Sequence, residues 1–220
     1  MEWERYLAFS LEKIPYVAIT LMIAFTVHEF SHAFVAYKFG DETAKKQGRL
    51  TLNPFRHLDP LGTIFIFIAG FGWARPVPVN RFFFKNPRLA GVLVSVAGPL
   101  SNIIMAMLGF TIWYGLLGSG FAEGLPSFVP GFLDMFIQLN IILFVFNLLP
   151  FPPLDGYRIV EDLVPVGTRA KMTQYEQYGA LLFLILVITP LNEYTIQPIF
   201  EVVLPIIVEG LNDFFYQLFV

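Results

Sequence analysis

TVHEFSHA, residues 26–33, lies in the middle of an apolar run that extends from residue 14 to residue 39. An α-helix rises about 1.5 Å per residue and turns once in about 3.6 residues, so positions four apart lie on one face. His28 and His32 therefore point in the same direction, and their imidazole nitrogens come close enough to share one metal ion. Glu29 reaches the flank of that site. H-E-x-x-H on a helix is the arrangement that supplies two zinc ligands and a general base.

The surroundings of this motif strengthen the metal interpretation. Glu29 is the only formally charged residue between Lys13 and Lys38. An ionisable side chain in a lipid-facing segment is costly and by default indicates function. H-E-x-x-H also occurs by chance in unrelated helices, but a purely structural His-Glu-His cluster in such a segment would need buried partners for its polar atoms. The motif thus favours a metal site, which still needs a third ligand.

The composition indicates a protein that is solvated mainly by lipid. The 220 residues are 56% hydrophobic and only 14% charged, whereas about a quarter of a soluble domain is charged. No hydrophilic stretch is long enough for a separate globular domain, so we expect one membrane-embedded unit over residues 1–220. With no Cys and only three His, the available metal ligands are His, Asp and Glu. No basic patch with interleaved aromatic residues occurs, so nucleic-acid binding is not implied.

The pattern of apolar segments predicts an all-α polytopic membrane protein with about five or six transmembrane helices. Residues 1–13 are expected to form a short interfacial helix. The segment 196–220 could be a last span or a pair of surface helices. The expected spanning segments are residues 14–39, 90–117, 178–191 and a discontinuous span over 131–164 that is interrupted by prolines.

Residues 61–73 are apolar but too short for a comfortable span. Basic stretches lie on both sides, at 38–60 and 75–88, and cytoplasmic loops are the ones that keep Lys and Arg. We therefore expect a segment that enters the membrane and returns, with a short tilted crossing helix as the alternative. Because residues 49–53 could be a strand, the prediction is a re-entrant segment or a short β-hairpin near the cytoplasmic side.

Asp155 is the candidate for the third metal ligand. His32 lies six residues before Lys38, which is roughly 9 Å at the helical rise. Asp155 lies at a similar spacing before Glu161 and Asp162, so the two segments place metal-competent side chains at one depth. Two His and one carboxylate with a fourth position open is the pattern of catalytic zinc. The alternative for Asp155 is a helix N-cap, since Asp-Gly after prolines is also ordinary turn chemistry.

Three motifs of the chain resemble those of the site-2 protease family, zinc metalloproteases that cleave within membranes. They are HEFSH at 28–32, GPLSN at 98–102 and NLLPFPPLDG at 147–156. GRLTLNP at 48–54 and HLDPLG at 57–62 are similar to the short bacterial and archaeal branch, which has neither a PDZ nor a CBS domain. The resemblance implies His28, His32 and Asp155 as ligands of one Zn²⁺ per chain, with Glu29 as the catalytic base.

The resemblance also implies that Asn147 and Asn102 lie near the site and could bind the substrate or the oxyanion. For both, an interhelical hydrogen bond is the alternative. His57 is expected to be structural, and residues 82–84, all Phe, are expected to be interfacial anchors.

The expected activity is hydrolysis of a peptide bond in or next to a transmembrane segment of a membrane-protein substrate. We expect a multi-pass protein of a prokaryotic cell membrane, with its active site toward the cytoplasmic side. A metal-ion transporter is the alternative, because intramembrane His and carboxylates also form ion pathways; a catalytically silent membrane scaffold is a third reading. A transporter should carry further ligands on other helices, and no His follows His57. The natural substrate, its gating and the oligomeric state are open at this point.

Overall fold

The computed structural model describes residues 7–220, which form a helical bundle without strands. Its helices are α1 (Ile14–Lys38), α2 (Thr43–Lys46), α3 (Pro60–Ala69), α4 (Pro87–Gly118), α5 (Phe128–Asn147), α6 (Asp155–Leu163), α7 (Val166–Ile188), α8 (Asn192–Thr195) and α9 (Gln197–Phe219). Short 3₁₀ turns lie at Pro54–Arg56, Arg81–Phe83 and Phe121–Gly124.

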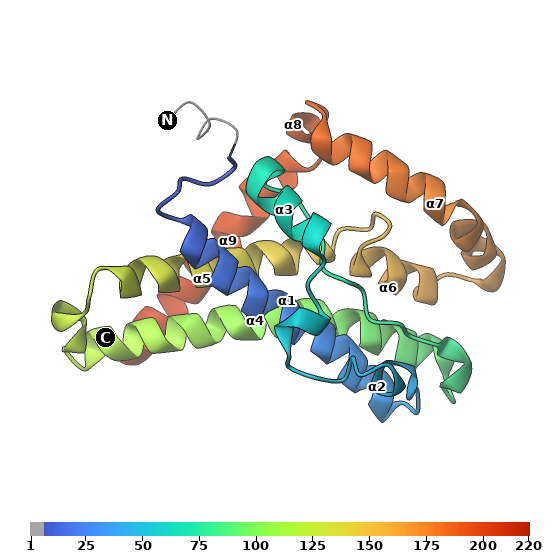
Figure 1. Ribbon diagram of the computed structural model, residues 1–220, viewed down its shortest axis with the longest axis horizontal. Coiled ribbons are helices and arrows are strands. Elements are labelled where there is room, and N and C mark those ends of the chain that lie inside the picture. The colour runs from blue at the N-terminus through green and yellow to red at the C-terminus, as the bar shows by residue number, and fades with distance from the viewer. Residues whose placement is uncertain (1–6) are drawn as a thin grey trace.

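Helix α4 is the centre of the bundle: it contacts α1, α5, α6 and α9 (Figure 1). Helices α1, α4 and α5 are long and apolar enough to cross a membrane. The all-α class is thus confirmed, while the prediction of five or six spans, together with the re-entrant role of residues 61–73, stays a prediction. The segment 197–219 is the single helix α9, which packs on α4 and α5, so a pair of surface helices there is wrong.

The predicted strand at residues 49–53 and the predicted β-hairpin are wrong. In the described part of the chain, only Leu58 and Ala74 form an isolated antiparallel bridge. The backbone around the expected strand is satisfied locally instead, because the Asn53 carboxamide oxygen accepts the Phe55 N–H at 3.1 Å and Thr51 Oγ1 accepts the Asn53 N–H at 3.2 Å. Such short side-chain contacts compete with strand pairing.

The structure also differs from the prediction in the N-terminal segment and at the start of α7. Residues 7–13 form turns rather than an interfacial helix, and the rest of that predicted helix lies outside the described residues. Helix α7 begins at Val166, 12 residues earlier than the apolar run at 178 suggested. Its first half is polar but contains good helix formers, which extend the helix without an apolar pattern.

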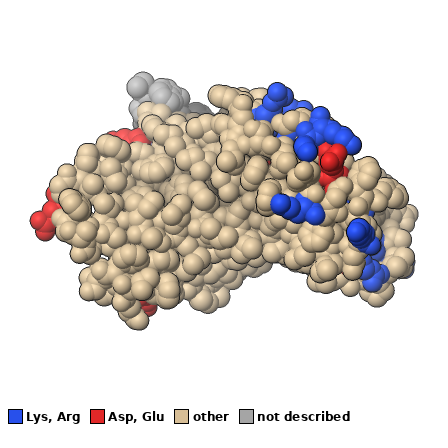
Figure 2. Space-filling view, turned by 90° about the horizontal axis from the view of Figure 1, so that it is seen from below, with Lys and Arg blue, Asp and Glu red and all other residues tan. Residues whose placement is uncertain are grey.

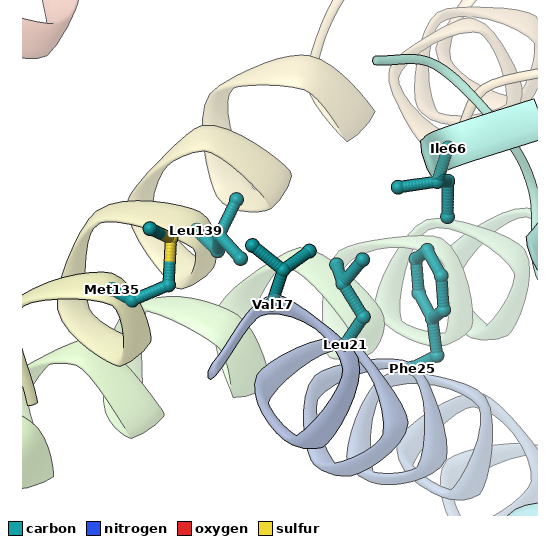
Figure 3. Close-up of a cluster of buried hydrophobic side chains, with 6 residues drawn as sticks. All are labelled: Val17, Leu21, Phe25, Ile66, Met135 and Leu139. Atoms are coloured by element: carbon teal, nitrogen blue, oxygen red, sulfur yellow. The ribbon is translucent and has the colours of Figure 1, made fainter. Parts of the chain in front are cut away.

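The apolar core that positions α1 is built from residues one helical turn apart. Figure 3 shows this cluster, in which α1, α3 and α5 meet. A second cluster joins α4, α5 and α9, where the rings of Phe110 and Phe215 stack with centroids 5.7 Å apart. The first cluster consists of Val17, Leu21, Phe25, Ile66, Met135 and Leu139. The first cluster therefore packs α1 against α3 and α5.

The proline-rich stretch after α5 ends that helix at Asn147, and the chain becomes helical again at Asp155. Proline removes a backbone donor and clashes with the preceding turn, so residues 150–153 cannot continue α5. The predicted break is confirmed. It leaves α6 free to pack on α4 (Figure 1).

Candidate metal centre

Helix α1 brings His28 and His32 together on one buried face. Only 6% and 8% of their surfaces are exposed, and their Nε2 atoms lie 3.0 Å apart. The rings meet nearly at right angles, with centroids 4.6 Å apart. One helical turn therefore places two imidazole nitrogens at the same point.

The third side chain at this point comes from the first residue of α6. Asp155 Oδ2 lies 3.2 Å from Nε2 of His28 and 3.2 Å from Nε2 of His32. In the described part of the chain the Asp155 side chain makes no capping hydrogen bond, so the N-cap alternative does not describe it. One candidate ligand atom from each residue lies within 4.8 Å of the others.

The second nitrogen of each imidazole faces an oxygen on α4. His28 Nδ1 lies 2.7 Å from Asn102 Oδ1, and His32 Nδ1 lies 2.7 Å from the Val94 carbonyl oxygen. A carbonyl oxygen only accepts, so His32 must donate from Nδ1 and carries a lone pair on Nε2 when neutral. Metal-binding imidazoles are oriented by outer contacts of this kind.

A relay of amides fixes the corresponding state of His28. Asn140 Nδ2 donates to the Phe136 carbonyl at 2.8 Å, so its Oδ1 is free to accept from Asn102 Nδ2 at 3.1 Å. Asn102 then presents its own Oδ1 to His28. Since an amide oxygen only accepts, His28 also donates from Nδ1 and carries its lone pair on Nε2.

Two nitrogen lone pairs and one carboxylate oxygen thus converge on a single buried point. Without a positive charge between them, these electron-rich atoms would repel one another. Nitrogen and oxygen ligands from two His and one carboxylate, with room for a fourth ligand, are those of catalytic zinc sites. The residues present therefore fit Zn²⁺.

Glu29 lies beside the cluster and is held from the loop between α3 and α4. Its side chain is buried, with 7% exposed, and its Oε2 accepts the Val77 N–H at 2.8 Å. The metal cluster and Glu29 line one cavity of about 640 Å³. One part of the remaining wall is apolar and includes Phe25, Phe71, Trp73, Val77, Leu143 and Phe146, and another part is charged and includes Arg81, Arg158, Glu161 and Arg169.

The two candidate asparagines occupy different places. Asn147 lines the cavity, and its Nδ2 donates to the Leu143 carbonyl at 2.9 Å. Asn102 is fully buried behind His28, where it joins α4 to α1 and α5, as the interhelical alternative expects. Sequence reasoning missed Asn140, although an amide seven residues before Asn147 on the same apolar helix was the available signal.

The third histidine lies away from the cluster. His57 is fully buried, and its Nε2 lies 2.7 Å from the Thr51 carbonyl. Burial lowers the pKa of His57 below its usual range. Of the three Phe expected at the membrane interface, Phe82 and Phe83 are exposed, while Phe84 is buried in a cluster with α1 and α4; the anchor prediction is wrong for Phe84.

Comparison with known proteins identifies the family. The profile of peptidase family M50 matches residues 122–190. "Putative zinc metalloprotease YwhC" of Bacillus subtilis (strain 168) is 61% identical over 201 residues, which cover 89% of this chain and 90% of that protein. The chain belongs to peptidase family M50. "Putative zinc metalloprotease Rip2" of Mycobacterium tuberculosis (strain H37Rv) is 35% identical over 200 residues, 82% of this chain and 72% of the relative. No solved structure matches the chain.

The M50 protein is therefore an intramembrane zinc protease and an integral membrane protein. Members of this family act on membrane proteins within the bilayer. Nothing supports the transporter alternative: within residues 7–220, His28, His32 and Asp155 are the one group of His and carboxylates with metal-binding geometry.

Proposed function

We propose that His28, His32 and Asp155 hold one Zn²⁺ per chain, and that Glu29 is the general base for hydrolysis of a peptide bond in or next to a transmembrane segment. The observation that carries this proposal is the meeting of three ligand atoms from α1 and α6, with Glu29 on the same cavity wall. In this proposal, residues 1–220 act as one membrane-embedded peptidase domain.

In the proposed reaction, Glu29 moves the proton and the cavity walls shape its surroundings. Zinc, when bound, lowers the pKa of a coordinated water and polarises the scissile carbonyl. Glu29 has one oxygen tied to the Val77 N–H, which leaves Oε1 to take a proton from the attacking water and to pass it to the leaving amine. The apolar side chains in the cavity wall lower the local dielectric constant beside Glu29, which strengthens these charge interactions.

Asn147 is the better of the two candidates for substrate contact. It lines the cavity, whereas Asn102 is already engaged with His28 and Asn140. Within residues 7–220, the Asn147 side chain makes one hydrogen bond, from Nδ2 to the Leu143 carbonyl of its own helix. Its amide oxygen is therefore available to a substrate N–H in the cavity.

We also propose that the metal end of the molecule faces the cytoplasm of a prokaryotic cell. After Lys13, every Lys and Arg lies either from Lys38 to Arg88 or from Arg158 to Lys171. These residues gather at one end of the molecule (Figure 2), the end that is reached by the C-terminus of α1 and the N-terminus of α4. Basic residues mark the cytoplasmic side of membrane proteins, and the relatives named above come from bacteria.

The test is a Glu29→Gln variant, purified in detergent and assayed with a transmembrane substrate. We expect zinc at one per chain and no cleavage, because the metal ligands remain while the base is lost. Cleavage retained by Glu29→Gln would overturn the assignment of the base, and zinc lost from it would overturn the separation of roles.

The substrate itself offers a second measurement. A helix hides its carbonyls in its own hydrogen bonds, so it must unwind before a carbonyl can enter the cavity. Residues that destabilise a helix near the cut should therefore raise the rate of cleavage. A rate that does not respond to Gly or Pro substitutions in the substrate would count against cleavage inside a helical segment.

A further inference from the structure

Arg49 is a buried cation with no assigned role. Only 6% of its surface is exposed, and it forms no ion pair within residues 7–220. Its Nη2 donates to the Arg75 carbonyl at 2.5 Å, while its Nε has no hydrogen-bond partner in that part of the chain. Burying a guanidinium with so few partners is costly. We therefore expect Arg49 to have a structural or catalytic role.

Arg49 binds the backbone of Arg75, and the residue two positions later, Val77, binds the proposed base Glu29. Arg75 also donates its N–H to the His57 carbonyl at 2.7 Å. Arg75 and Val77 each precede a proline, which favours extended backbone, and in extended backbone the polar groups of residues i and i+2 lie on the same edge. Val77, two residues after Arg75, accordingly donates its N–H on this edge, and the acceptor is Glu29.

The residues on either side of Val77 are prolines, which have no N–H. Between residues 76 and 78, Val77 is thus the one backbone donor. The position of the peptide before Pro76 decides where this donor points, and Arg49 holds the oxygen of that peptide. Asp41 Oδ2 accepts the Asn80 N–H at 2.6 Å, which fixes the segment at its other end.

We propose that Arg49 is a positioning residue for Glu29, acting through the Arg75–Val77 backbone. This inference rests on the proposed role of Glu29 as the base. The guanidinium fixes the Arg75 carbonyl, the fixed backbone delivers the Val77 N–H to Glu29 Oε2, and Glu29 is thereby aimed with its other oxygen toward the cavity. The charges of Arg49 and Glu29 also favour this arrangement. Burial lowers the pKa of Arg49, and the negative charge of Glu29 raises it.

The inference is tested with Arg49→Gln and Arg49→Lys in the full-length protein, with zinc content, kcat and KM measured together. We expect one zinc per chain and an unchanged KM in both variants. A displacement of about 1 Å in a catalytic group reduces turnover by about 100-fold, so kcat should fall by about that factor in Arg49→Gln. Arg49→Lys should lie between this variant and the wild type, since Lys keeps the charge without the planar fork.

The matched control is Arg56→Gln, which removes an exposed arginine from the same loop and should leave kcat unchanged. If Arg49→Gln has normal kcat, or loses zinc in step with activity, the inference is overturned, because the residue is then dispensable or supports only the fold. Glu29→Gln separates the two proposals. If it still cleaves, the proposed base is wrong; if it is inactive while Arg49→Gln is not slowed, only the present inference fails.

A second variant keeps the inference testable even if Arg49→Gln does not fold. Val77→Pro removes the N–H that Glu29 accepts and retains extended backbone, whereas Val77→Ala trims the side chain and retains the N–H. We expect a larger loss of kcat in Val77→Pro. Combining it with Arg49→Lys should reduce kcat no further than Val77→Pro alone, because both changes act on one hydrogen bond. Fully additive losses would overturn the inference.

Discussion

Helix α6 carries a carboxylate near each end, half-buried Asp155 and buried Asp162, and the two differ in the positive charge that the protein places beside them. Asp162 lies 2.8 Å from Arg81 Nη2 and 3.0 Å from Arg169 Nη2, so the protein itself supplies its counter-charges. Asp155 instead faces the Nε2 atoms of two imidazoles whose protons are directed elsewhere. A carboxylate for which the chain provides no positive charge therefore marks a metal site more clearly than acidic residues alone.

The largest expected contrast comes from replacing each carboxylate with its amide. Asp155→Asn removes a negative ligand, so the loss of zinc affinity should exceed the 10–100-fold that roughly follows from loss of an outer partner, and cleavage should disappear. Asp162→Asn should keep one zinc per chain. Breaking a buried ion pair costs about 3–5 kcal/mol, so this variant should instead unfold more readily. Metal analysis and thermal unfolding in detergent measure the two effects. Equal loss of zinc in both variants would mean that the ends of α6 are not independent.

Two glycines on one face of α4 allow the metal site and the ion pairs of Asp162 to be disturbed separately from α4 instead of from α6. A Cβ on Gly98 would lie 2.6 Å from His28 Cε1 and closer still to His32, whereas a Cβ on Gly91 would lie 2.8 Å from Asp162 Cγ. Gly98→Ala should therefore displace the imidazoles and reduce zinc content. Gly91→Ala should disturb the ion pairs of Asp162 and reduce stability with zinc retained.

Gly115→Ala is the control for both, because among the described residues a Cβ there would meet Phe219 alone, at 3.9 Å. Ala is favoured over Gly in a helix by about 1 kcal/mol, so this variant should be at least as stable as the wild type. If Gly98→Ala binds zinc normally, the tight approach of α4 to the histidines is not needed for the site.

The asparagines sharpen the contrast within the site itself. Asn102→Ala removes the acceptor that orients His28, and zinc affinity should fall by about 10–100-fold. Asn147→Ala leaves the histidine contacts intact and should raise KM with zinc affinity unchanged, if Asn147 contacts the substrate as proposed. Competition with a chromogenic chelator measures the affinity. Gln138→Ala, an exposed amide on α5, should change neither quantity.

The spacing of His28 and His32 and the proline break before Asp155 were readable from the sequence because both follow from local rules. Helical periodicity aligns residues four apart, and a proline cluster stops a helix wherever it occurs. The bundle's all-α class followed from apolar segments of sufficient length. These features depend on near neighbours in the chain and not on how the helices meet.

The outer partners could not be predicted in the same way. Val94 contributes a backbone carbonyl to His32, and Val77 contributes a backbone N–H to Glu29; neither contact depends on a recognisable side chain. The stretch 49–53 has strand-like composition, but strand formation depends on a partner strand. Arg49 instead turns its side chain to the backbone of residue 75.

The smallest expected effect is on the pH dependence of stability and concerns His57, the histidine that lies outside the metal cluster. Burial lowers its pKa, so the folded protein keeps His57 neutral at a pH where the unfolded chain, with a pKa of about 6.5, already takes up a proton. As the pH falls through that window, the unfolded state binds more protons than the folded state and stability decreases.

His57→Gln can still donate to the Thr51 carbonyl but cannot ionise. Between pH 7.5 and pH 5 its Tm should therefore fall by a few degrees less than that of the wild type, since about 1 kcal/mol corresponds to about 2–4 °C in a chain of this size. Equal decreases in Tm would show that His57 is protonated in the folded protein, which would contradict its placement as a buried neutral group.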